Sequence, residues 1–143
     1  MTGPDLRKFA LFGSLDEPEL QLVAFLLQPR ELAPEQKLWR EGDPSDGVWL
    51  LEEGVLRFET RSGGPIGQRA APAWFGCAGL VSEAPREASA RAEGPVRASL
   101  LSKTAFAQLL EAAPRTAARL LGAISSELAS VLSDGVSFMA ERR

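Results

Sequence analysis

The segment between residues 30 and 101 constrains the fold most, because short apolar runs alternate there with turn-forming residues. Its clearest part, residues 37–64, reads KLWREGDPSDGVWLLEEGVLRFETRSGG. Glycine and proline mark EGDPSDG as a turn, and residues 55–60 alternate apolar and polar side chains like a half-buried strand. The runs VWLL and VLRFET flank Glu53 and Gly54, which predicts a hairpin. Short strands at this spacing favour an antiparallel sandwich or barrel over a parallel sheet.

A helix is predicted before this β-rich segment. The run SLDEPELQLVAFLL has apolar residues at helical spacing. Ser14 and Glu17 form a candidate capping box, and Pro18 is tolerated in the first turn. We expect Leu11 and Phe12, which precede the cap, to pack back against this helix.

Two further helices are predicted after the β-rich segment. KTAFAQLLEAAP, which begins at Lys103, indicates a short helix that ends near Pro114. The rest of the chain, RTAARLLGAISSELASVLSDGVSFMAERR, carries an apolar stripe at helical spacing. We expect the first turns of this helix to pack on the β-rich unit and the later turns to form a homodimer seam. The stripe comprises Ala117, Leu120, Leu121, Ile124, Leu128, Val131 and Leu132.

Composition excludes several classes of function. A length of 143 residues fits one domain with its own core. The chain has no histidine and one cysteine, Cys77, which rules out Ser-His-Asp and Cys-His catalysis and argues against a zinc site; an enzyme is not expected. A net charge of −3 argues against a nucleic-acid partner. With no membrane-length apolar run and no disulfide, we expect a cytoplasmic protein.

Four pieces of the sequence stand in an order that resembles a known family. They are LFGSLDEPELQLVAFLL, LWREGDPSDGVWLLEEGVLRF, WFGCAGL with APREASARA, and LLSKTAFAQLLEAAPRTAARLLGAISSEL. Together they resemble the cyclic nucleotide-binding domain of catabolite-activator-type regulators, of the regulatory subunit of cAMP-dependent protein kinase and of cyclic nucleotide-gated channels. The resemblance covers about residues 9–132, and it depends on the order and spacing of the pieces rather than on any one of them.

The resemblance implies a mainly β fold with flanking α-helices. It implies an eight-stranded jelly-roll barrel at about 30–101, an N-terminal helix, and two C-terminal helices at about 103–140, all in a single domain spanning 1–143. In such domains the nucleotide lies in the barrel against a phosphate-binding cassette. No cofactor is expected beyond that ligand, which would be cAMP or cGMP.

The resemblance also assigns the candidate binding residues. Arg86 falls where the family has the arginine that pairs with the cyclic phosphate, for which a planar guanidinium is well suited. Gly76 would let the backbone approach the anion closely, and the short helix after it would offer backbone N–H groups. The full set is Gly76, Cys77, Ala78, Gly79, Leu80, Arg86, Glu87 and Ala88.

Two of these residues depart from the family pattern. Cys77 replaces the glutamate that takes the ribose hydroxyl, and losing a hydrogen bond to a charged group costs about 1.5–3 kcal/mol. Glu87 stands where serine, threonine or alanine is usual. If Glu87 points into the pocket, its repulsion of the phosphate costs up to about 4 kcal/mol at an effective dielectric near 20. If Glu87 points outward, only the replacement at Cys77 weakens nucleotide binding.

Two readings of function therefore stay open. The first is a stand-alone regulatory module that binds a cyclic nucleotide, cAMP above all, and signals to a protein partner through its C-terminal helix. The second is a degenerate domain that no longer binds nucleotide and acts as an interaction or dimerisation scaffold. A transcription factor would need a helix-turn-helix after the long helix, and the sequence ends at Arg143. No DNA-binding domain or membrane contact is expected.

Overall fold

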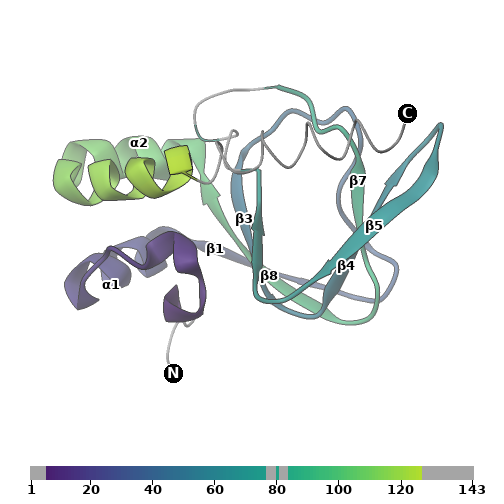
Figure 1. The fold of residues 1–143 in the computed structure, drawn as a ribbon, viewed down its shortest axis with the longest axis horizontal. Helices are drawn as coiled ribbons and strands as arrows, with labels where there is room; N and C mark the ends of the chain where they lie inside the picture. The colour runs from purple at the N-terminus through teal and green to yellow at the C-terminus, as the bar shows by residue number, and fades with distance from the viewer. Residues whose placement is uncertain (1–5, 77–79, 81–83, 127–143) are drawn as a thin grey trace.

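A computed structural model describes residues 6–76, 80 and 84–126 of the chain (Figure 1). Helical elements precede and follow the strands: η1 (Leu6–Lys8), η2 (Ala10–Phe12), α1 (Glu17–Leu26) and α2 (Lys103–Ala112), with residues 114–126 also helical. The strands are β1 (Gln28–Leu32), β2 (Lys37–Trp39), β3 (Gly47–Glu53), β4 (Val55–Thr60), β5 (Gly64–Ala70), β6 (Ala73–Phe75), β7 (Ser89–Ala92) and β8 (Val96–Ser102).

The eight strands form two antiparallel sheets of four. Their orders are β1-β8-β3-β6 and β2-β7-β4-β5. Among the described residues no ladder of hydrogen bonds joins one sheet to the other, so the expected barrel is not closed. The mainly β architecture with flanking helices is confirmed. Figure 1 shows α1 and α2 gathered on one side of the two sheets.

The predicted hairpin at Glu53 and Gly54 is wrong. The strands β3 and β4 follow one another in the chain but belong to different sheets. The strand β3 is buried along almost its whole length and pairs with β8 and β6 on its two sides. Gly54, at φ 98°, carries the chain across to the second sheet. The SGG turn does form a hairpin, because β4 pairs with β5.

Side chains of β3 alternate between two hydrophobic cores. Val48 and Leu50 belong to a core shared with the helices, and Trp49 and Leu51 belong to the core between the sheets. The helical core also buries Leu11 and Phe12, as the sequence predicted, beside residues of α1 and α2. The N-terminal segment and the C-terminal helices therefore cover one face of the β1-β8-β3-β6 sheet.

The first helix begins two residues later than predicted. Asp16, not Ser14, is the cap: its carboxylate accepts from the Glu19 N–H at 3.0 Å, and the Glu19 carboxylate accepts from the Asp16 N–H at 3.0 Å. A cap at Ser14 would have placed Pro18 at the first position whose N–H bonds back to the cap carbonyl. Proline has no N–H, so the helix begins where Pro18 falls within the first turn.

The last described helix is tied to the start of α1. Thr116 Oγ1 donates to Glu19 Oε2 at 2.8 Å, and Arg119 Nη1 donates to Glu19 Oε1 at 2.6 Å. Ala117, Leu120 and Ile124 of the predicted stripe are buried in the helical core. Leu121 is partly buried against the same core. The other stripe residues, Leu128, Val131 and Leu132, lie outside the described residues, so the dimer seam stays a prediction. No helix in residues 6–76, 80 and 84–126 is long and apolar enough to cross a bilayer.

This tie makes the contact between the helices sensitive to acid. Hydrogen bonding by the Asp16 N–H, then by Thr116 and Arg119, holds the pKa of Glu19 below its ordinary value of 4.5 against the opposing effect of burial. The unfolded chain therefore binds this proton more readily, so the stabilisation is complete above pH 4.5 and is lost as the pH falls through the lowered pKa. We expect Glu19→Gln to lower the free energy of unfolding at pH 7, with the difference from wild type shrinking below pH 4.5.

Urea denaturation at several pH values measures this effect, with Glu111→Gln on the exposed side of α2 as control. An equal loss for both variants, or a Glu19→Gln loss that does not change with pH, would contradict the assignment.

Candidate functional site

The turn at residues 42–46 and the segment at 84–86 lie side by side, although about forty residues separate them in the chain. The Arg86 N–H donates to the Asp43 carbonyl at 2.7 Å, and the Gly42 N–H donates to the Arg86 carbonyl at 2.8 Å. Ser45 Oγ donates to the Ala84 carbonyl at 2.7 Å. The predicted EGDPSDG turn is therefore present, and it holds the backbone of Arg86 in place.

The guanidinium of Arg86 is turned into the protein. The residue is only 8% exposed, and its Nη2 donates to Asp46 Oδ1 at 2.8 Å and to the Gly47 carbonyl at 3.4 Å. The guanidinium carbon lies 4.3 Å from the centre of the Trp39 ring, a cation–π contact. Arg86 Nε is buried and has no hydrogen-bond partner. A buried group that is always charged and has an unused N–H donor can bind an anion.

Gly76 lies directly against Arg86. Its φ of 80° is in the left-handed region, which favours glycine. A Cβ at this position would overlap Arg86 Nη1 and lie 3.1 Å from the Gly47 carbonyl oxygen. Any other residue would therefore have to displace the guanidinium, so glycine at this position makes room for Arg86. The predicted approach of the Gly76 backbone to an anion stays a prediction.

Three aromatic rings that pack against the core between the sheets form a cluster, and one of them, Trp39, contacts the arginine. Phe75 lies 5.1 Å from Phe58 and 6.3 Å from Trp39 between ring centres, and Trp39 lies 6.3 Å from Phe58. Trp39 Nε1 donates to the Ala88 carbonyl at 2.7 Å, which fixes the ring. A cluster of aromatic rings beside a cation suits a ligand that joins a flat ring to an anionic group.

The other predicted residues are placed as follows. Leu80 is buried in the helical core, and Ala88 is half-buried and contributes its carbonyl to Trp39. Glu87 is exposed, and its side chain has no hydrogen bond or ion pair with the described residues. Cys77, Ala78 and Gly79 lie outside the described residues. In the described ranges no three His, Cys, Asp or Glu side chains gather as a metal site would require.

Sequence reasoning assigned no site role to Asp46 or Trp39, although both contact the Arg86 guanidinium. Asp46 was identified only as a turn residue. Its carboxylate, 55% exposed, is the counterion of a side chain that is only 6% exposed. The signal in the sequence was the second aspartate of the EGDPSDG turn, Asp46, together with a cassette arginine elsewhere in the chain.

Sequence comparison matches a family model and several curated relatives. The model of the family described as "Cyclic nucleotide-binding domain" matches residues 29–113. The chain is 30% identical over 108 residues to the cAMP-dependent protein kinase regulatory subunit of Mucor circinelloides f. lusitanicus. That match covers 73% of this chain but only a quarter of the relative's length.

Solved structures show the same fold. A cyclic nucleotide-binding domain from Methylobacillus flagellatus KT superimposes with a TM-score of 0.80 at 23% identity, covering 92% of this chain and 76% of that one. The regulatory domain of Toxoplasma gondii PKA, solved with cAMP, gives 0.69 at 22% identity and covers 90% and 47% of the two chains. With the family model matching more than half of its residues, this chain belongs to the cyclic nucleotide-binding domain family.

Proposed function

We propose that this chain is a regulatory module that binds a cyclic nucleotide, cAMP above all, beside Arg86. The buried guanidinium against Gly76 carries the proposal, since it places a permanent charge where backbone and ligand can approach closely. The Mucor circinelloides relative is named a cAMP-dependent regulatory subunit, and the Toxoplasma gondii domain was solved with cAMP. Both names support the same ligand for this chain.

Binding would exchange one counterion of Arg86 for another. The cyclic phosphate would take the place of the Asp46 carboxylate, which is exposed enough to turn towards water, and would also accept from Arg86 Nε. A charge-assisted hydrogen bond formed away from water is among the stronger polar contacts. The purine would lie against Trp39, Phe58 and Phe75, where stacking adds to the binding energy.

The strand order supports a jelly-roll winding of the two sheets, the arrangement expected for this ligand site. The signal would leave through the C-terminal helix. Residues 114–126 pack in the helical core, and Thr116 bonds to Glu19 of α1. A shift of this helix would therefore move the side chains of α1 and α2 that pack in the same core. If the nucleotide changes the affinity of a partner for this helix by some factor, linkage requires that the partner change the affinity for the nucleotide by the same factor.

Two features favour the alternative function of a scaffold without nucleotide. Arg86 already has a counterion in Asp46, and the ribose-binding glutamate is replaced by Cys77. A nucleotide would have to displace the Asp46 carboxylate from Arg86, and it would bind without a glutamate to accept from its ribose hydroxyl. In that case the contacts of Arg86 would serve only to fix the turn at residues 42–46.

Thermal unfolding with added nucleotide separates the two functions. A ligand present at a hundred times its Kd stabilises the folded state by about 2.7 kcal/mol. We expect cAMP to raise the unfolding temperature more than cGMP, and both to exceed 5′-AMP, whose phosphate is not cyclic. The absence of any shift with millimolar cAMP, from a chain that unfolds cooperatively, would favour the scaffold.

Glu87 should matter little to nucleotide binding. Its side chain is exposed and unpaired in the described structure, and an exposed charge near a ligand contributes about 1 kcal/mol or less. We therefore expect Glu87→Gln to change the Kd for cAMP by less than about fivefold. Glu93→Gln, another exposed carboxylate, is the control. A gain of about a hundredfold for Glu87→Gln alone would show that this carboxylate faces the phosphate.

A further inference from the structure

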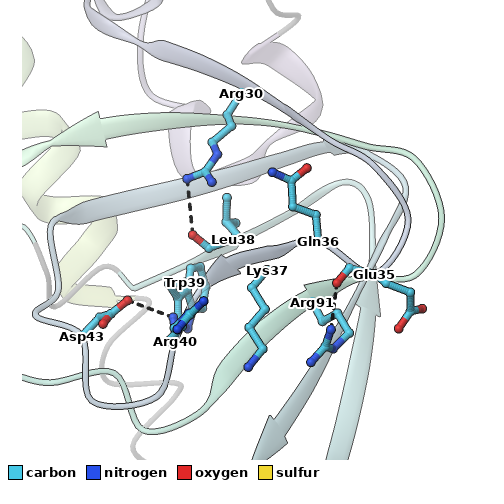
Figure 2. A pocket seen from close by; sticks show the side chains of 9 residues that line it. All are labelled: Arg30, Glu35, Gln36, Lys37, Leu38, Trp39, Arg40, Asp43 and Arg91. Atoms are coloured by element: carbon cyan, nitrogen blue, oxygen red, sulfur yellow. Dashed lines mark hydrogen bonds between the residues drawn. The ribbon is translucent and has the colours of Figure 1, made fainter.

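A pocket lined by charged side chains lies along β2 (Figure 2). Its volume is about 510 Å³. The charged residues that line it are Arg30, Lys37, Arg40, Arg91, Glu35 and Asp43. Four cations face two carboxylates, an excess of two positive charges in a chain whose net charge is −3. The Arg86 guanidinium is not part of this lining, although the Trp39 ring that it contacts is.

The pocket follows the edge of a sheet. The strand β2 is the first in the order β2-β7-β4-β5, so within the described residues no strand pairs with its other side. Across this edge lies β1, an edge strand of the other sheet, from which Arg30 Nη1 reaches the Leu38 carbonyl at a long 3.5 Å. An edge strand presents backbone donors and acceptors to any chain that can pair with it.

The cations along this edge differ in whether their side chains already have hydrogen-bond or ion-pair partners. Arg91 donates to Glu59 at 2.9 Å and to the Glu35 carbonyl at 2.8 Å. The side chains of Lys37 and Arg40 have no hydrogen bond or ion pair with the described residues. The pKa of Glu59 is lowered mainly by its hydrogen bond from Arg91, and the charge of Lys37 contributes least to that shift. Two cations are thus available to an acidic ligand.

We propose that the free edge of β2 binds an extended, carboxylate-rich segment of a partner protein, which adds a strand to the β2-β7-β4-β5 sheet. Side chains of an added strand alternate between its two faces. Figure 2 shows Arg30 on one side of β2 and Lys37 pointing away from it on the other, so acidic side chains on both faces of the segment would meet a cation.

The same charges select against self-association. A second copy of this chain would bring its own Lys37 and Arg40 to the same edge, and like charges directly opposed across strands are destabilising. An acidic strand turns that repulsion into attraction. The edge is therefore suited to a partner of opposite charge and not to a second β2 edge.

Fluorescence anisotropy with labelled hexaglutamate tests the proposal on the full chain at low salt, with hexalysine as the opposite-charge probe. We expect saturable binding of hexaglutamate only, and slower hydrogen exchange in residues 36–40 when it is bound. Lys37→Gln with Arg40→Gln should weaken binding about tenfold or more. The matched control, Arg97→Gln with Arg115→Gln, removes the same charge elsewhere and should leave binding within about twofold.

Arg86→Ala separates this site from the nucleotide site, since hexaglutamate binding should survive that substitution whether or not cyclic nucleotides bind. Four results would overturn the proposal: no binding of hexaglutamate, equal weakening by the control pair, loss of binding in Arg86→Ala, or displacement by equimolar pyrophosphate. The last would identify a small-anion pocket instead.

Discussion

Replacing Arg86 with alanine is expected to weaken cyclic nucleotide binding by about a hundredfold or more while the protein stays folded. The phosphate would lose its charged partner, and a buried ligand charge left unpaired is costly. The fold should survive because the backbone bonds of Arg86 to Asp43 and Gly42 do not use the side chain. The abandoned Asp46 carboxylate is 55% exposed and can be hydrated. Calorimetric titration measures the loss.

Two further variants show whether the charge or the fork of the arginine matters. Arg86→Lys keeps the charge but cannot offer two parallel donors, so its affinity should fall between those of wild type and Arg86→Ala. Arg97→Ala removes an arginine that pairs with Glu53 on β3 and should bind like wild type. Equal affinities for wild type and Arg86→Ala would mean that the nucleotide binds elsewhere.

Gly47→Ala is expected to destabilise the fold by about 3 kcal/mol or more. Gly47 has a φ of 145° and begins β3 directly beside β8. A Cβ here would overlap the Leu101 carbonyl oxygen and lie 2.8 Å from Ser102 Cα. Both are backbone atoms in the central strand pair, so they cannot turn aside as a flexible side chain would. Backbone strain and overlap therefore add.

Gly67→Ala is the matched control for the backbone conformation. Gly67 has a similar φ of 155°, but nothing lies within 4 Å of the position that its Cβ would take. Strain without overlap should cost only about 1 kcal/mol. Denaturation midpoints compare the two variants. Equal losses would show that the conformation alone, and not the contact with β8, requires glycine at residue 47.

Local patterns in the sequence predicted the elements better than their partners. Turn residues and apolar spacing located α2 and the β4–β5 hairpin, since both depend on neighbours in the chain. The hairpin at Gly54 was wrong because β3 finds its partners in β8 and β6, which lie far along the chain. The helix cap was misplaced by two residues because two acid-containing capping boxes overlap, and only the position of Pro18 decides between them.

The same limit applies to the candidate site. Gly76 and Arg86 could be identified from the cassette motif, and their ligand-binding roles stay predictions. The contacts of Arg86 with Asp46 and Trp39 were not predicted, because each joins residues about forty or more positions apart. No local pattern shows that a cassette arginine already has a counterion, so only the structure shows which group a phosphate must displace.

Calorimetric titration of the wild-type chain with cAMP, beside Arg86→Ala, tests the central claim most directly. A cyclic nucleotide module should give a saturable heat with a single site per chain, and Arg86→Ala should weaken this binding by about a hundredfold or more. No heat up to millimolar cAMP, from wild-type protein that is folded by circular dichroism, would contradict the proposal and leave the chain as a scaffold that keeps the family's fold without its ligand.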